Sequence, residues 1–226
     1  MKKSSLFVAF LMVILLAGCS SPKNSTDNSK DNSKLTPSEF VALLEKQFDC
    51  NTQNDLTKIS GKFSDPSYPD AKIDAFLDIT PDEVRQEIGC QIFKNKTVPI
   101  TFIVYHDVAY QIAAPVYGNG ILDIHTCDFD HNGQIDLIYS ISVSLSGIYT
   151  PAIGSFNFTS LKEKGIYSAI NVEDFVLQKV NNESFTLYTI DPSSKMSTDY
   201  SQMTLIPGKE IGTITSEKNT PVVHIK

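Results

Sequence analysis

The strongest secondary-structure signal of this chain lies in residues 98–145, VPITFIVYHDVAYQIAAPVYGNGILDIHTCDFDHNGQIDLIYSISVSL. This stretch contains runs rich in β-branched and aromatic residues, the composition typical of strands. Residues that favour turns separate these runs, among them His106-Asp107 and Gly118-Asn119-Gly120. We therefore expect an antiparallel sheet. The predicted strands are Ile100–Tyr105, Val108–Ala114, Ile121–Cys127 and Ile135–Leu145.

Runs of the same composition continue toward the C-terminus, two of them joined by a turn at Asn181-Asn182. No segment repeats with a period of about 20 to 50 residues, which argues against a propeller or a solenoid. The further predicted strands are Ile153–Phe158, Phe175–Val180 and Phe185–Ile190, with weaker candidates at Met203–Ile206 and Val222–Ile225.

Two helix starts precede the strands. Thr36-Pro37-Ser38-Glu39 and Thr80-Pro81-Asp82-Glu83 both match a capping box with proline at the first helical position. The first helix is expected to run to about Phe48 and the second from Pro81 to Ile88, closed by Gly89. The predicted fold class is therefore α+β, with two N-terminal helices followed by a mainly antiparallel β-sheet domain. The first helix should bury Phe40, Leu44 and Phe48, with Val41 beside them.

The N-terminus has the order of segments of an export signal, with Lys2 and Lys3 before the apolar run Leu6–Leu16. That run is shorter than the roughly 20 residues needed to cross a bilayer. It ends in Leu16-Ala17-Gly18-Cys19, which resembles the lipobox of bacterial lipoproteins. The resemblance implies that residues 1–18 are a signal peptide and that Cys19 carries a diacylglycerol. The alternative is an ordinary secretory signal that ends near a cysteine.

The segment after Cys19, Ser20–Lys34, has no aliphatic or aromatic side chain and cannot bury apolar surface. Residues 19–34 are thus predicted to be a lipidated cysteine with a disordered tether, and residues 35–226 a single α+β domain. The expected location is the cell membrane, with the domain lipid-anchored and facing outside the cytoplasm. Ser20, the residue after the cysteine, carries no charge that would retain the protein at the inner membrane. In a cell with two membranes, the outer membrane is therefore an alternative location.

The chain is acidic, with 19 Lys and Arg against 26 Asp and Glu. This balance argues against nucleic acid as a partner and against broad contact with anionic lipid. Apart from Cys19 there are three cysteines, Cys50, Cys90 and Cys127, so at most one disulfide can form within the chain. Cys50 and Cys90 are the preferred pair because each follows a predicted helix. Three buried thiols are the alternative.

One segment carries a chemical pattern: Asp128-Phe129-Asp130-His131-Asn132-Gly133-Gln134-Ile135-Asp136. Side-chain oxygens stand at its first, third, fifth and ninth positions, glycine at the sixth, and a main-chain carbonyl is offered at the seventh. These are the oxygen offsets of a calcium loop, and calcium takes about six to eight oxygen ligands. The predicted ligands are Asp128, Asp130, Asn132, Gln134 and Asp136.

The loop departs from an EF-hand, because Tyr139 stands at the twelfth position and strands are expected on both sides. It resembles the strand-loop-strand calcium turns of integrin-type propeller repeats, D-x-D-x-D-G-x-x-D-L, whose ending Asp136-Leu137 reproduces. It also resembles single aspartate-rich turns of envelope lipoproteins, which bring no activity with them. The alternative is an acidic hairpin turn without a metal, since Asp, Asn and Gly are common turn residues.

Motifs of familiar enzymes are missing from the sequence. There is no G-x-S-x-G elbow, phosphate loop or G-x-G-x-x-G, and no pair of histidines at helical metal-ligand spacing. We therefore expect an envelope lipoprotein that presents a calcium-stabilised binding domain to an unidentified envelope protein or ligand. The first alternative is a hydrolase whose carboxylate or serine site is assembled only in the fold. A substrate-capture lipoprotein for a transporter is disfavoured, because such proteins usually have two larger lobes.

Overall fold

The computed structural model describes residues 34–49, 75–113, 118–145, 147–170 and 172–226, which belong to one compact unit, Asn32–Lys226. The signal peptide, Cys19 and nearly all of the tether lie outside these residues, so their assignments stay predictions. No helix within the described ranges is long and apolar enough to span a bilayer.

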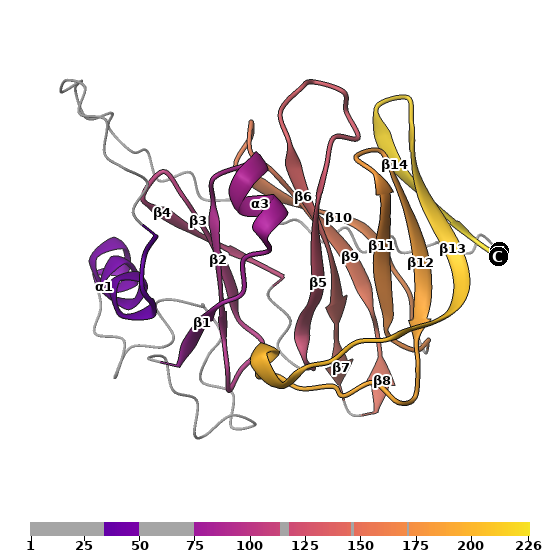
Figure 1. Ribbon diagram of the computed structural model, residues 1–226, viewed down its shortest axis with the longest axis horizontal. Helices are drawn as coiled ribbons and strands as arrows, with labels where there is room; N and C mark the ends of the chain where they lie inside the picture. The colour runs from indigo at the N-terminus through magenta and orange to yellow at the C-terminus, as the bar shows by residue number, and fades with distance from the viewer. Residues whose placement is uncertain (1–33, 50–74, 114–117, 146, 171) are drawn as a thin grey trace, which may run out of the picture. The chain divides into compact units, whose positions relative to one another are not determined.

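The described residues form three four-stranded antiparallel sheets and a short hairpin (Figure 1). The first sheet has the order β1 (Phe76–Asp78), β2 (Gln91–Asn95), β3 (Thr101–Tyr105), β4 (Val108–Ile112). The second has the order β10 (Lys162–Ser168), β9 (Ala152–Asn157), β6 (Asp136–Ser142), β5 (Gly120–Cys127). The third runs β11 (Phe175–Asn181), β12 (Ser184–Ile190), β13 (Pro207–Glu217), β14 (Thr220–Ile225), and the hairpin is β7 (Ser144–Leu145) with β8 (Ile148–Tyr149).

Three apolar cores follow from the alternation of side chains along the strands. The helix α1 (Pro37–Phe48) packs on one face of the first sheet, where the rings of Phe40 and Phe93 stack with centroids 4.1 Å apart. The other face of that sheet shares a core with the second sheet, as Ile92 and Tyr139 illustrate. The second and third sheets share the third core. The second sheet is therefore covered on both faces, which is why every residue of β6 is buried.

The predicted fold class is wrong, because the described part of the chain is mainly antiparallel β-sheet and has only one helix longer than six residues. The first capping box forms: the N–H of Thr36 donates to Glu39 Oε2 at 2.7 Å, and Thr36 Oγ1 accepts from the N–H of Glu39 at 3.3 Å. The second segment gives only α3 (Asp82–Glu87), which has no side-chain cap. The Thr80 hydroxyl bonds Asp78 and the N–H of Ile92 instead of the helix N-terminus.

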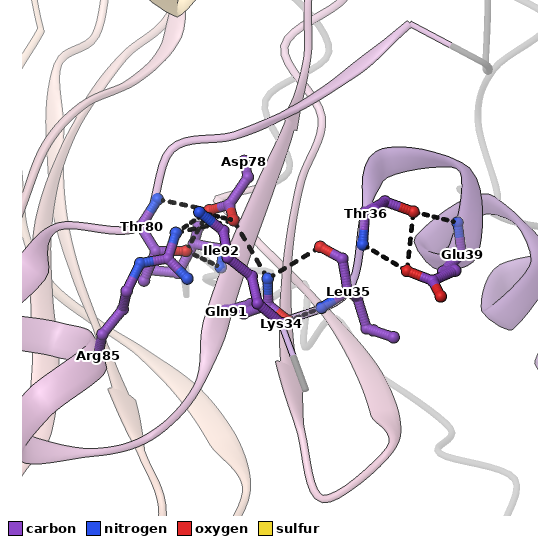
Figure 2. A network of polar contacts seen from close by, with 9 residues as sticks. All are labelled: Lys34, Leu35, Thr36, Glu39, Asp78, Thr80, Arg85, Gln91 and Ile92. Atoms are coloured by element: carbon purple, nitrogen blue, oxygen red, sulfur yellow. Dashed lines mark hydrogen bonds and ion pairs between the residues drawn. The ribbon is translucent and has the colours of Figure 1, made fainter. Parts of the chain in front are cut away.

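The start of the described chain is held on the first sheet by Gln91 (Figure 2). The N–H of Leu35 donates to Gln91 Oε1 at 2.8 Å, and Gln91 Nε2 donates to the carbonyl of Leu35 at 3.1 Å. Gln91 Nε2 also donates to Asp78 Oδ2 at 3.1 Å. These contacts connect the beginning of α1 to β1 and β2.

The predicted disulfide between Cys50 and Cys90 is also wrong, because Cys90 is a free buried thiol. Cys50 itself lies outside the described residues. Burial raises the pKa of Cys90 to about 12, which keeps the group as an unreactive thiol. Cys127 is free and buried as well. Its pKa is raised mainly by burial and secondly by the nearby Asp136 carboxylate.

Candidate functional site

The calcium-type loop connects β5 to β6 at one end of the second sheet. The last residue pair of the two strands is Cys127 opposite Asp136, so the loop proper covers residues 128–135. His131 and Gly133 have φ angles of 55° and 80°, in the left-handed region that glycine enters at little cost. The expected sharp turn at the sixth position is therefore present.

Two of the predicted ligands bond to each other and to the loop backbone. Asn132 Nδ2 donates to Asp130 Oδ2 at 2.9 Å, and the N–H of Asn132 donates to Asp130 Oδ1 at 3.3 Å. The N–H of Gln134 donates to Asn132 Oδ1 at 2.6 Å. Hydrogen bonds of this kind, from a backbone N–H to an Asx side chain two residues earlier, also stabilise turns that hold no metal.

Asp136 ties the loop to the turn that follows β9. Its Oδ1 accepts from the N–H of Phe158 at 2.9 Å, and its Oδ2 accepts from Asn157 Nδ2 at 2.7 Å. Burial raises the pKa of Asp136, the two hydrogen bonds lower it, and the carboxylates of Asp130 and Asp128 raise it further, so that the net shift is upward. The three carboxylates of the loop therefore repel one another.

Asp128 is the least satisfied of the predicted ligands. Its backbone N–H donates to the carbonyl of Asn182 at 2.7 Å, which ties the loop to the β11–β12 turn. Its Oδ1 atom is buried and has no hydrogen-bond partner among the described residues. A buried acceptor without a donor destabilises a fold, and the neighbouring carboxylates increase this cost. A bound cation would remove it.

The donor types fit calcium, since all are oxygens and three are carboxylates. The side-chain arrangement is not that of a finished site: within the described ranges, no group of three or more His, Cys, Asp or Glu residues is placed to hold a metal ion. Asp130 and Asn132 would have to exchange their mutual hydrogen bond for the cation. The fold thus brings the predicted ligands to one hairpin, but their oxygens are not directed at a common centre.

A second constellation, absent from the sequence-based predictions, adjoins the loop. His131 Nδ1 lies 3.2 Å from Glu183 Oε1, and His131 Nε2 lies 3.2 Å from Ser216 Oγ. This order of contacts is that of a hydrolase triad. However, Ser216 Oγ donates to the carbonyl of Phe129 at 2.5 Å, and the N–H of Ser216 is bonded to the carbonyl of Glu183 at 3.0 Å.

These two bonds commit both donors of Ser216. The hydroxyl hydrogen is directed at the Phe129 carbonyl instead of the imidazole, and the N–H is not available to stabilise an oxyanion. The constellation therefore acts first as a tie between the loop and β13. Its serine and histidine are 85 positions apart in the sequence, so no local pattern could have indicated it.

A further polar cluster, on β5, bonds the buried part of the edge strand β11. Asp123 Oδ2 accepts from the N–H of Leu177, and His125 Nε2 lies 3.1 Å from the carbonyl of the same residue. Leu177 belongs to β11, an edge strand of the third sheet. Side chains from β5 thus bond a strand edge that has no neighbouring strand on that side among the described residues. Burial raises the pKa of Asp123, while His125 and the hydrogen bonds from Ser140 and Leu177 oppose the rise.

Comparison of the chain with protein-family models, with curated proteins and with solved structures finds no match.

Proposed function

We propose that this chain is an envelope lipoprotein, anchored through acylated Cys19, whose β domain binds calcium in the loop 128–136 and presents a binding surface outside the cytoplasm. The observation that carries the calcium site is the buried Oδ1 of Asp128, which has no donor in the described part of the chain and lies beside two further carboxylates. The lipid anchor is supported by the Leu16-Ala17-Gly18-Cys19 motif. The ligand or partner protein is a component of the envelope.

Calcium in this loop stabilises the fold and takes no part in a reaction. Its side-chain ligands are Asp128, Asp130, Asn132 and Asp136, with the main-chain carbonyl of Gln134 and water completing the shell. Because the loop is bonded to Asn182 and, through Asp136, to the turn after β9, the ion strengthens the junction of the second and third sheets.

Thermal unfolding of the full chain in calcium and in chelator tests this proposal. Single sites of extracellular type bind calcium at about 10⁻⁴ to 10⁻³ M. At about ten times the dissociation constant, binding adds about 1.4 kcal/mol to the free energy of unfolding. The melting temperature should then rise by about 3–6 °C. Magnesium should have a smaller effect because it requires stricter octahedral geometry.

Two variants sharpen the measurement. Asp128→Asn removes one of the repelling charges at the position with the unpartnered oxygen, so it should raise the stability of the calcium-free protein and abolish the response to calcium. Asp107→Asn, in the β3–β4 turn, is the matched control and should keep the full response. Identical melting curves of the unmutated chain in calcium and in chelator would show that the loop is an ordinary turn.

The lipid anchor is tested separately with Cys19→Ala. This variant should carry no metabolically incorporated lipid and should be found as an unprocessed precursor or as a secreted protein. A variant that still carries the lipid label would refute the lipobox interpretation.

The second candidate function is ester hydrolysis by Glu183, His131 and Ser216, favoured by the order of their contacts. A fluorophosphonate probe, which reacts with activated serines, tests it. Labelling that is lost in Ser216→Ala but kept in Ser193→Ala would establish an activated Ser216. Absence of labelling would show that the hydroxyl stays bonded to the Phe129 carbonyl, as the geometry favours.

A further inference from the structure

The segment Leu137–Leu161 contains no Asp, Glu, Lys or Arg, although 20% of the chain is charged. Burial accounts for this in β6 and in part of β9. It does not account for the hairpin β7–β8, where Ile148 is 49% exposed and Tyr149 is 51% exposed. An uncharged hairpin with large apolar side chains in solvent needs another explanation.

A second exposed apolar segment adjoins this hairpin. The N–H of Ala169 donates to the carbonyl of Pro151 at 3.1 Å, which places the end of β10 beside the base of the hairpin. Ile170 and Val172 follow, 71% and 42% exposed. We call Ile148, Tyr149, Ile170 and Val172 the apolar tip. It lies at the opposite end of β6 from the calcium-type loop, since β6 runs from Asp136 at the loop to Ser142 near the hairpin.

We propose that the apolar tip inserts into the surface of the membrane that holds the lipid anchor. The inference rests on the proposed lipidation of Cys19, which keeps the domain within reach of that surface. A bilayer strongly disfavours charged side chains, and none occurs in the hairpin. Tyrosine is a residue of the membrane interface, where its ring is apolar and its hydroxyl remains hydrated.

The charges around the tip determine which lipids it fits. Glu173 is exposed beside Val172, and Asp174 follows it, hydrogen-bonded to Ser142 Oγ at 2.7 Å. Two carboxyl groups at the border of the tip limit its insertion to a shallow depth. They also mean that anionic lipid does not strengthen the contact. The surface that fits is therefore a neutral bilayer.

The experiment uses the fact that the chain contains no tryptophan. Tyr149→Trp introduces a single fluorophore at the tip of the full lipidated chain, reconstituted in neutral phosphatidylcholine vesicles. Vesicles with brominated acyl chains should quench its emission by more than half, and the emission should shift to shorter wavelength. Val180→Trp is the matched control, because Val180 is 63% exposed and lies two residues before Asn182, whose carbonyl bonds Asp128 of the calcium-type loop. Its emission should not change.

A second variant tests whether the quenching is caused by insertion of the apolar tip. Adding Ile148→Asp to Tyr149→Trp should abolish the quenching while the chain still floats with vesicles and melts as before. Adding Val180→Asp to Tyr149→Trp should change nothing.

Three outcomes would overturn the inference. A Tyr149→Trp chain that floats but whose tip fluorophore is not quenched overturns this inference alone. A chain that does not float overturns the lipid anchor and this inference with it. If the tip fluorophore is shielded without vesicles and Ile148→Asp converts a dimer to a monomer, the tip is covered by a second copy of the chain instead of a membrane.

Discussion

The segments Thr36–Glu39 and Thr80–Glu83 share the pattern Thr-Pro-x-Glu, yet they are used differently in the molecule. In the first, threonine and glutamate bond each other's backbone, and a helix of 12 residues follows. In the second, the Thr80 hydroxyl donates to Asp78 Oδ1 at 2.6 Å and accepts from the N–H of Ile92 at 2.7 Å (Figure 2). Only six helical residues follow.

The side chain of Glu83 likewise contacts residues outside its own helix. Its carboxylate lies 3.4 Å from Lys179 Nζ and 3.4 Å from His125 Nδ1, which belong to β11 and β5. In the second segment the threonine and glutamate side chains thus bond groups outside α3, and the threonine accepts from a backbone N–H that water cannot reach. The N–H of Ile92 is buried, and leaving such a group unpaired costs about 1–3 kcal/mol. Water can satisfy an exposed helix N-terminus, and losing a side-chain cap typically costs about 1 kcal/mol.

The largest loss of stability is expected for Asp78→Ala, because Asp78 is the centre of the hydrogen-bond network that includes Thr80. Asp78 accepts from Arg85 Nη2 at 2.7 Å, as well as from Thr80 and Gln91. The variant leaves the partly buried guanidinium without its counter-ion, and unfolding in urea should show a loss of about 3 kcal/mol. A loss below about 0.5 kcal/mol, the level of an ordinary surface substitution, would contradict the central role of Asp78.

The dependence of the unfolding free energy on pH gives a second test of the Asp78 carboxylate. Burial acts to raise the pKa of Asp78, but the hydrogen bonds from Arg85, Thr80 and Gln91 outweigh it, and the net shift is downward. Its contribution to stability is therefore present above the ordinary pKa of aspartate and is lost as the pH falls through the lowered value. In Asp78→Asn, the decline of stability below about pH 4 should be shallower than in the unmutated chain.

The next effect belongs to Thr80→Val, which keeps the shape of the side chain and removes its oxygen. The buried N–H of Ile92 loses its acceptor, so the expected loss is about 2 kcal/mol. Thr80→Ser is the control and should lose less, because it keeps the hydroxyl. The far-ultraviolet circular dichroism should be unchanged, since α3 has no side-chain cap to lose. Equal stability of the Val and Ser variants would argue against the bond to Ile92.

The same contrast explains which parts of the fold the sequence could predict. The strands found at β3–β6 were predicted to within a few residues because they alternate or run through large buried side chains. The strand β10, with the sequence KEKGIYS, was not predicted because it is an exposed edge strand with charged residues. β2 carries the buried Lys94, whose side chain reaches the carbonyl of Thr198 at 2.7 Å, a partner that no local pattern indicates.

For the candidate site, the sequence could indicate which oxygens occupy the β5–β6 hairpin: Asp128, Asp130, Asn132 and Gln134 lie in the loop, and Asp136 is the first residue of β6. Whether those oxygens converge depends on partners far along the chain. Asn157 holds the carboxylate of Asp136, and the carbonyl of Asn182 binds the backbone of Asp128. The contact between His131 and Ser216 is likewise invisible before folding. Local pattern predicts the composition of such a site, while long-range hydrogen bonds determine its geometry.

A smaller effect is expected at the first segment. Thr36→Ala removes the side-chain acceptor of the Glu39 N–H in an exposed turn, and water replaces it. The loss should be about 1 kcal/mol, roughly half of that for Thr80→Val. Here the circular dichroism should also change, because α1 frays at its first turn. If Thr36→Ala costs more than Thr80→Val, the distinction drawn between the two threonines is wrong.

The smallest effect belongs to Glu39→Gln. Glutamine also completes a capping box, because its side-chain oxygen can accept from the N–H of Thr36, so only the charge at the helix N-terminus is lost. The hydrogen bonds from the backbone and side chain of Thr36 lower the pKa of Glu39, and this carboxylate is fully exposed. The contribution of the charge is present above the ordinary pKa of glutamate and is lost as the pH falls through the lowered value.

The stability difference between the unmutated chain and Glu39→Gln should therefore be small near neutral pH and should vanish in acid, once the pH lies below the lowered pKa of Glu39 and both side chains are uncharged. Urea unfolding at the two pH values measures it. Glu83→Gln gives the comparison, because its carboxylate faces Lys179 and His125 instead of its own helix start. Added salt should reduce the effect of Glu83→Gln by screening the Lys179 pair, and it should leave the helix signal of α3 unchanged. A difference for Glu39→Gln that persists in acid would mean that the glutamine fails to accept from Thr36, so that the box depends on the shape of the carboxylate and not on its charge.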